Sequence, residues 1–125
     1  MKVERILIQE PSDIIMSEEQ DEEIEPVDWS FQSKINQDLK DSDLQGANLR
    51  RVILDGSNLQ GSNLAGADLR NASLIGTDLM KCALDGADLR GVRGRYAIWR
   101  RANWWDAKMN DDLREALKKK WPKPE

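Results

Sequence analysis

Leucine recurs at every fifth position from residue 39 to residue 89. Steps of five residues would spread the leucines around the axis of a helix and would alternate them between the two faces of a strand, so neither element can bury them together. A chain that turns once in each five-residue unit can do so. The leucines of this series are Leu39, Leu44, Leu49, Leu54, Leu59, Leu64, Leu69, Leu74, Leu79, Leu84 and Leu89.

Small side chains occupy a second periodic position, two residues before each leucine. Such self-similarity is typical of a solenoid, in which each unit buries its apolar side only by stacking on its neighbours. Residues 66–70 and 86–90 both read Gly-Ala-Asp-Leu-Arg, so the closest copies lie twenty residues apart, which predicts four units per coil. The small residues are Ser42, Ala47, Val52, Ser57, Ser62, Ala67, Ala72, Thr77, Cys82 and Ala87.

Over roughly residues 36–110 the chain resembles the pentapeptide-repeat family, whose pattern is Ala-Asp/Asn-Leu-x-x. The pattern is matched at Ala47-Asn48-Leu49, Ala67-Asp68-Leu69 and Ala87-Asp88-Leu89. The resemblance implies an all-β solenoid, a right-handed quadrilateral β-helix of about four coils. It also implies that each leucine, and the small residue two positions before it, point inward.

The repeat continues beyond the last leucine, because Ala97, Ala102 and Ala107 keep the small position in step. Large side chains replace leucine there, and we expect them to complete the core and cover its last coil. They are Trp99, Trp104 and Met109. Gly94 interrupts one leucine column, which predicts a local bulge.

Residues 111–125 are predicted to form a capping helix and a short tail. Asn110, Asp111 and Asp112 suit the start of a helix, and Leu113, Leu117 and Trp121 form one apolar stripe. Pro122 ends the helix. Without a cap, the last coil would expose an edge that can recruit another chain.

The first 35 residues lack the repeat and form an acidic N-terminal segment that we expect to be mostly flexible. Carboxylates crowd together at Glu18, Glu19, Asp21, Glu22, Glu23 and Glu25, and such a segment buries too little apolar surface to offset its ordering entropy. Val3, Ile6, Leu7 and Ile8 are predicted to add a short strand. Trp29, Phe31 and Ile35 are predicted to cover the first coil.

The composition argues against catalysis. The chain has no histidine, which removes the commonest general base and the usual zinc ligand. Cys82, the single cysteine, falls in an inward column and is expected to be a buried small hydrophobe. The repeated aspartates precede leucine and suit turn hydrogen bonding better than acid–base work. We therefore expect no enzyme activity, no catalytic residue, no cofactor and no metal; an enzyme remains the third alternative.

The charge distribution bears on one function that the resemblance suggests. Some pentapeptide-repeat proteins mimic duplex DNA and bind type II topoisomerases such as DNA gyrase, which requires an acidic rod. Residues 36–110 instead hold nine aspartates and eleven lysines and arginines, a net charge of +2, while the whole chain has −4. A DNA-mimicking topoisomerase regulator therefore stays the alternative to a rigid protein-interaction module.

A basic column suggests where a partner binds. Arg50, Arg70 and Arg90 share one outward column, although Asp68 and Asp88 lie close enough to neutralise it through ordinary surface ion pairs. Arginine with aromatic residues is the composition of interaction hot spots. The predicted interaction face consists of Arg50, Arg70, Arg90, Arg93, Arg95, Tyr96 and Trp105.

The sequence also bears on the partner, the cellular location, the oligomeric state and the source of the protein. The partner is an unidentified protein, and the overall acidity argues against nucleic acid. No segment is apolar enough to cross a membrane and the start lacks a secretory signal, so we expect a cytoplasmic protein without membrane contact. We expect a monomer or an end-to-end homodimer. The resemblance implies a bacterial source, in particular a cyanobacterial one.

Overall fold

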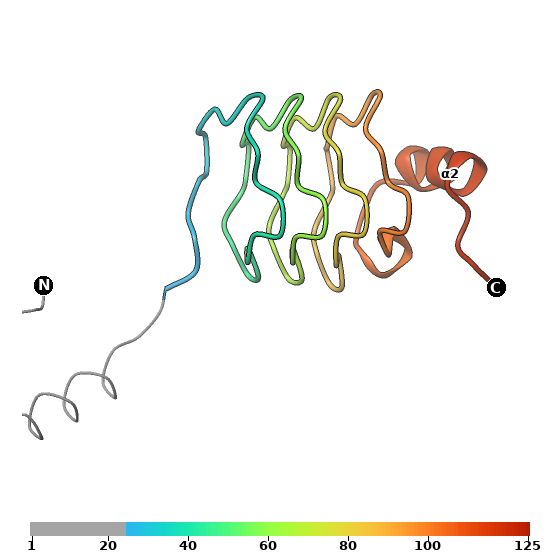
Figure 1. Ribbon diagram of the computed structural model, residues 1–125. Coiled ribbons are helices and arrows are strands. Elements are labelled where there is room, and N and C mark those ends of the chain that lie inside the picture. Colours follow the sequence, from blue (N-terminus) through green and yellow to red (C-terminus); the bar gives the residue numbers. More distant parts are fainter. Residues whose placement is uncertain (1–24) are drawn as a thin grey trace, which may run out of the picture.

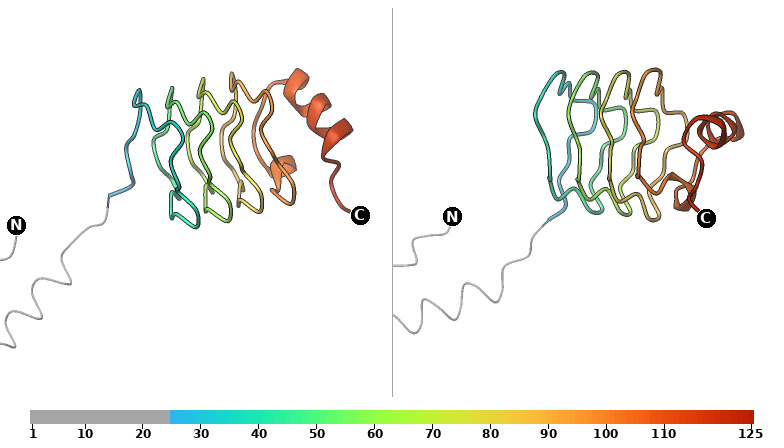
Figure 2. Two further views of the ribbon diagram at one scale, coloured as in Figure 1. Left: turned by 45° about the horizontal axis from the view of Figure 1, so that its top comes forward. Right: turned by 45° about the vertical axis from the view of Figure 1, so that its right-hand side comes forward.

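A computed structural model of the chain describes residues 25–125 as a short solenoid of stacked coils followed by one α-helix (Figure 1). The chain enters at one end of the stack, and the helix lies at the other end in every view (Figure 2). Within the described residues, no helix is long and apolar enough to span a lipid bilayer.

Parallel backbone contacts join each coil to the next. Twelve β-bridges link a residue to the one twenty positions further on, from Asp28 with Asn48 to Asp88 with Lys108. Because the chain turns after every bridge, the contacts stay single and residues 25–125 contain no longer strand. Four turns in each twenty residues give the coil four sides. The solenoid is therefore confirmed, and its right-handed sense stays a prediction.

The first coil begins earlier than the leucines indicate. Asp28 pairs with Asn48 and Ser33 pairs with Ile53, so the ladder starts at residue 28 rather than at 36. Trp29 takes a position that leucine holds in later coils, which concealed this coil in the sequence pattern. The strand predicted near the N-terminus and most of the acidic run lie in residues 1–24, outside the described residues.

The predicted interior is buried. Ten of the eleven leucines expose 2% of their surface or less, and Leu39 is partly buried because it lies in the first coil. Trp99, Trp104 and Met109 complete the same core.

Polar residues in the small column bond to the preceding coil. The Thr77 hydroxyl donates to the Leu54 carbonyl at 2.8 Å, and the Cys82 thiol lies 3.0 Å from the Leu59 carbonyl. Ser57 donates in the same way to the carbonyl of Lys34 at 2.6 Å. The buried hydroxyl and thiol groups of these side chains therefore have hydrogen-bond acceptors in the preceding coil, so serine, threonine and cysteine are accommodated at the small position.

Gly94 does not produce the predicted bulge. The Ser73–Arg93 and Asp78–Ile98 bridges keep the twenty-residue register on both sides of the glycine. A Cβ atom at position 94 would lie 3.4 Å from Cζ2 of Trp99. The glycine therefore makes room for the indole ring that fills the interior of this coil, and the bulge prediction was wrong because it ignored that ring.

The regular coil gives way to a 3₁₀ helix, η2 (Trp104–Asp106). Here the Asn103 side chain replaces a main-chain acceptor. Its Oδ1 accepts from the Leu84 amide at 2.6 Å, while its Nδ2 donates to Asp85 at 2.7 Å. One side chain thus keeps a buried amide bonded where the ladder is interrupted.

Helix α2 (Asp111–Lys120) packs against the last coil, and its Leu117 belongs to the buried core. Trp104 Nε1 donates to the Trp121 carbonyl at 2.7 Å, which ties the end of the helix to the coil. Asn110 has the extended backbone of a helix start, but its side chain makes no capping hydrogen bond, contrary to the sequence prediction. That the helix acts as a cap against association stays a prediction.

At the other end of the solenoid, only one of the three predicted covering residues packs against the core. Trp29 is partly buried there, and Lys34 Nζ lies 4.6 Å from the centre of its ring. Phe31 and Ile35 are exposed. The prediction was wrong for these two because they occupy turn positions, where side chains point outward.

Substituting Leu64 or Leu69 by alanine should reduce the free energy of unfolding by about 2–5 kcal/mol, because both residues are fully buried between neighbouring coils. Ile75→Ala is the control, since Ile75 lies at an exposed turn. Denaturant unfolding measures all three. Equal stability of the leucine variants and the control would contradict the inward assignment.

Deleting residues 111–125 should make the protein associate, because the deletion exposes Trp104 and the edge of the last coil. Light scattering over a range of protein concentrations checks this outcome. Deleting residues 1–24 should leave the oligomeric state unchanged. A shortened chain that stays monomeric at high concentration would show that the helix does not act as a cap.

Candidate interaction surfaces

Most of the predicted interaction residues gather around one side of the solenoid. That side contains the stacked residues Ile53, Ser73 and Arg93. Turns border it before and after, and their side chains point outward. We call this side with its two bordering turns the arginine face, and its members are Phe31, Ile35, Arg50, Arg51, Ile53, Arg70, Ile75, Arg90, Arg93, Arg95 and Tyr96.

Phe31 lies at one border of the arginine face, against two guanidinium groups. The Cζ atoms of Arg50 and Arg51 lie 5.7 Å and 5.6 Å from the centre of its ring, within cation–π range. With Arg70 and Asn71 these three residues line an open hollow of about 450 Å³. The hollow combines an exposed ring with positive charge and contains no carboxylate.

Exposed apolar side chains concentrate on the same face. Within residues 25–125, five large hydrophobic residues are exposed, and four of them border this side. Those four are Phe31 (63% exposed), Ile35 (47%), Ile75 (36%) and Tyr96 (77%). The arginine face is therefore both basic and apolar.

The two aromatic residues among these four have strained backbones. Phe31 and Tyr96 both have φ of +63°, in the left-handed region that seven glycines occupy at equivalent turns. A bulky residue in this region costs about 1–3 kcal/mol. The turn itself does not require an aromatic residue, because glycine occupies the same turn position elsewhere in the solenoid without this strain.

Two of the predicted arginines are neutralised by neighbouring carboxylates. Arg70 donates to Asp68 at 2.7 and 2.9 Å, and Arg90 donates to Asp88 at 2.6 and 2.8 Å. These hydrogen bonds lower the pKa of both aspartates. This neutralisation of the arginine column was predicted from the sequence.

The remaining arginines of the face have no such partner. No carboxylate of residues 25–125 forms an ion pair with Arg50, Arg51, Arg93 or Arg95. Arg95 lies with its Cζ 6.0 Å from the centre of the Tyr96 ring. Within residues 25–125, no carboxylate therefore neutralises these four side chains.

Trp105 does not belong to the arginine face. It lies at the turn that the twenty-residue register places diagonally across the coil from Tyr96, and it packs edge-on against Trp104 with ring centres 5.7 Å apart. The assignment of Trp105 was wrong because sequence proximity does not reveal which corner a residue occupies.

Trp105 instead lines a second, mostly apolar hollow of about 240 Å³ between the last coil and the end of α2. Three indole rings and two prolines contribute to its wall, and basic side chains surround it. We call it the C-terminal groove, and its lining residues are Trp99, Arg100, Arg101, Ala102, Trp105, Lys120, Trp121, Pro122 and Pro124.

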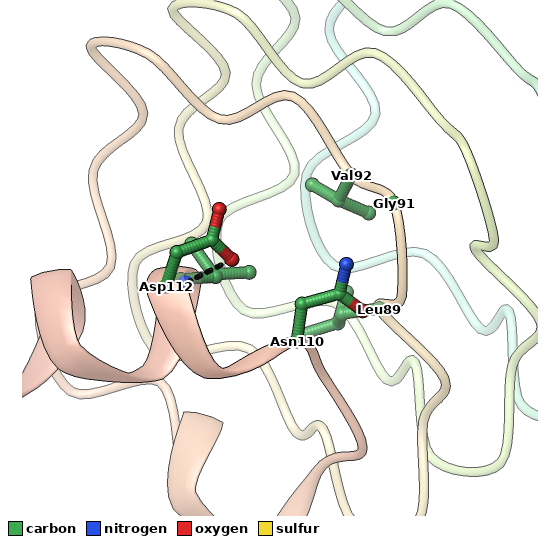
Figure 3. A pocket seen from close by; sticks show the side chains of 6 residues that line it. Leu89, Gly91, Val92, Asn110 and Asp112 are labelled. Atoms are coloured by element: carbon green, nitrogen blue, oxygen red, sulfur yellow. Dashed lines mark hydrogen bonds between the residues drawn. The ribbon is translucent and has the colours of Figure 1, made fainter.

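A third hollow, of about 330 Å³, lies between the start of α2 and the last coil (Figure 3). Asn110 and Asp112 supply its labelled polar groups, while Leu89, Gly91 and Val92 come from the coil. The Asp112 carboxylate accepts from the adjacent Leu113 amide at 2.8 Å. The residues that line this third hollow lie outside the arginine face and supply no cation.

The described residues offer little for catalysis. Burial raises the pKa of the Cys82 thiol to about 12, so this cysteine is a poor nucleophile. Within residues 25–125, no group of three or more Asp, Glu or Cys side chains is placed to hold a metal ion. The surfaces that stand out are suited to binding.

Five members of the arginine face were not predicted from the sequence: Phe31, Ile35, Arg51, Ile53 and Ile75. Ile53 lies on the side itself, and the other four occupy turn positions that lie outside the leucine pattern. An apolar residue at a turn where neighbouring units place glycine, asparagine or aspartate is the feature that could have identified Phe31.

The repeat is also found by comparison with known proteins. A family model described as pentapeptide repeats matches residues 36–71 and 53–91, with eight copies. The chain belongs to the pentapeptide-repeat family. A comparison with curated proteins found no match.

Several solved structures are similar. The pentapeptide repeat protein alr5209 from Nostoc PCC 7120 is 24% identical over 68% of this chain and 86% of its own, with a TM-score of 0.60. A pentapeptide repeat protein from the thylakoid lumen of Arabidopsis thaliana is 32% identical over 74% and 72%, with a TM-score of 0.35. QnrB1, a plasmid-mediated fluoroquinolone resistance protein, is 23% identical over 66% and 50%, with a TM-score of 0.43. The first of these supports the solenoid fold.

Acid should weaken the fold partly through Asp68 and Asp88. Their pKa values are lowered in the folded state, mainly by hydrogen bonds from Arg70 and Arg90. The stabilisation is therefore fully present above the unfolded-state pKa of about 3.9 and is lost as the pH falls through the folded-state value.

Melting temperatures measured between neutral and acidic pH test this linkage. The double variant Arg70→Ala/Arg90→Ala should show a shallower loss of stability in acid than the parent. Lys40→Ala/Lys81→Ala is the charge-matched control, because neither lysine forms an ion pair with another of residues 25–125. Identical acid profiles for the parent and the arginine variant would contradict the assignment.

Proposed function

We propose that this chain is a non-enzymatic, rigid protein-interaction module whose arginine face binds an acidic surface on a partner protein. The observation that carries the proposal is the coincidence of exposed apolar residues and arginines on one side of the solenoid. Aromatic and arginine side chains dominate the energetics of many protein interfaces. A bacterial, in particular cyanobacterial, cytoplasmic setting belongs to the same proposal.

The rigidity of the scaffold supports this role. The arginine face spans all the coils, and each coil is tied to the next by main-chain hydrogen bonds of about 2.7–3.0 Å. Its side chains are therefore held at fixed spacings. A partner would lose little binding energy in ordering the surface that it meets.

Electrostatics favour this role over DNA mimicry. A DNA mimic presents negative charge to its target, whereas this face presents Arg50, Arg51, Arg93 and Arg95 without ion pairs among residues 25–125. The DNA-binding site of a topoisomerase is itself basic and would repel this face, whereas an acidic surface on another protein would attract it. A topoisomerase regulator remains the alternative, and unchanged supercoiling activity of DNA gyrase in the presence of this protein would exclude gyrase as its target.

Reversing charge on the face should abolish capture of the partner without unfolding the protein. The triple variant Arg51→Glu/Arg93→Glu/Arg95→Glu alters exposed side chains that form no ion pair with another of residues 25–125. Lys40→Glu/Lys81→Glu/Lys108→Glu is the control, since it makes the same change in net charge away from this face. Pull-downs from native lysate with the intact chain compare the two with the parent. Equal capture by the arginine variant and the control would contradict the proposal.

The strained aromatics provide a second test. Phe31→Gly and Tyr96→Gly relieve a left-handed backbone while removing an exposed ring, so their melting temperatures should not fall although partner capture weakens. Lys81→Gly is the control at a left-handed turn off the face. Capture of the partner that survives both aromatic substitutions would exclude the rings from the interface. Nuclease treatment is a separate control, because it would abolish capture that depends on nucleic acid.

A further inference from the structure

The C-terminal groove brings together indole rings and positive charge without carboxylates. Its lining includes Arg100, Arg101 and Lys120, and Lys123 Nζ lies 5.8 Å from the centre of the Trp105 ring. Arg100 and Lys120 lie against Trp121, at 5.9 and 5.7 Å from its ring centre. A ligand for this groove needs an apolar group for the hollow and several negative charges for its rim.

The four cations around this groove have no carboxylate partner in the described part of the chain. The ion pairs found in residues 25–125 involve Arg70, Arg90 and Lys118 only. Arg100, Lys120 and Lys123 instead lie over indole rings, and all four cations are exposed. Negative charge brought to the groove would therefore meet cations that no described acid neutralises.

The chain carries a segment with the complementary chemistry. Ile14, Ile15 and Met16 form a short apolar cluster, and a dense acidic run follows at once. This order of apolar and acidic groups matches a hollow between rings that is surrounded by cations. The acidic residues are Glu18, Glu19, Asp21, Glu22 and Glu23.

We propose that residues 14–19 dock in the C-terminal groove of the same molecule, with the apolar cluster in the hollow and the carboxylates of Glu18 and Glu19 against the surrounding cations, which are Arg100, Arg101, Lys120 and Lys123. The surface is distinct from the arginine face, so this docking does not depend on the proposed function. Attachment to the solenoid gives the segment an effective concentration in the millimolar range, so modest contacts suffice.

The chain is long enough to make this connection. Four bridge steps separate Asp28 from Lys108, which corresponds to about 19 Å at a strand spacing of about 4.8 Å. The residues from Glu19 to Glu25 can span about 20 Å when extended, at roughly 3.3 Å per residue, so Asp21, Glu22 and Glu23 belong to the connection and not to the docked part. The connection is therefore long enough for the apolar cluster to reach the far end of the solenoid, although the first coil lies at the near end (Figure 1).

The arginine face competes less well for the segment. Arg70 and Arg90 are already bonded to Asp68 and Asp88, so only its other arginines, Arg50, Arg51, Arg93 and Arg95, are left to attract acid. The hollow at Phe31 is lined mainly by polar and basic groups and lacks the several rings of the C-terminal groove. It can attract acid but offers little to bury Ile14, Ile15 and Met16.

Paramagnetic broadening in the full chain tests the docking. A nitroxide attached at Ser12→Cys labels one site, because Cys82 is 2% exposed and the pKa of its thiol is raised to about 12. We expect the indole NMR signals of Trp105 and Trp121 to lose more intensity than that of Trp29, although Trp29 is much nearer in sequence. Greater loss at Trp29, or no loss at the groove, would overturn the proposal.

Matched variants identify the contacts. Lys120→Ser/Lys123→Ser should restore the Trp105 and Trp121 signals, while Lys118→Ser/Lys119→Ser, with the same change in charge, should not. Restoration by both pairs would indicate non-specific attraction and would overturn the proposal. The triple arginine variant of the arginine face should leave the broadening unchanged, which separates this test from that of the proposed function.

A mixing experiment decides whether docking occurs within one molecule. An isotope-labelled chain without nitroxide is mixed with an unlabelled chain that carries it. Unbroadened signals in the mixture support docking within the molecule. Broadening of Trp105 and Trp121 in the mixture would show docking between molecules and would overturn the proposal as stated.

Discussion

The main-chain hydrogen bonds between neighbouring coils are the constraint on which the rest of the structure depends. Each pair fixes the register of two coils, as in the bonds from Leu49 to Asp68 and from Asp68 back to Ala47. With that register set, leucines twenty residues apart lie over one another, and the interior becomes a set of close-packed columns. Every side of the coil contributes a single bridge, so no strand is long enough to hold the register alone. The register is held instead by the short turns that follow every bridge.

This constraint explains how much the sequence predicts. The buried leucines, the small column and the helix after the coils were all predicted, because inward positions recur with a fixed period and admit few residue types. Errors arose where one side chain replaced a repeating element. Trp29 hid the first coil because it stands in a leucine position, and Gly94 suggested a bulge because the ring of Trp99 fills its space.

The candidate surfaces were less predictable than the fold, for a physical reason. Turn residues point outward and are not selected by core packing, so the period says little about which of them are close in space. Register assigns Tyr96 and Trp105 to opposite corners although they are near in sequence. It also brings Phe31 together with Arg50 and Arg51 from the next coil, a grouping that appears only when the coils are stacked. Ion pairing between Asp68 and Arg70 was predictable because both residues lie in one unit.

Charge is divided along the chain in a way that the repeat does not require. Residues 36–110 have a net charge of +2, while the whole chain has −4, so the negative excess lies outside the repeats. A uniform charge of either sign would have increased solubility equally well. Separation of the charges instead gives the two parts of the chain an attraction that salt would screen within about 10 Å at moderate ionic strength. The solenoid fixes where its cations stand, and those around the indole rings at its C-terminal end form no ion pair within residues 25–125. These surface cations are not needed for the fold, and they are thus where the negative part of the chain can contact the positive part.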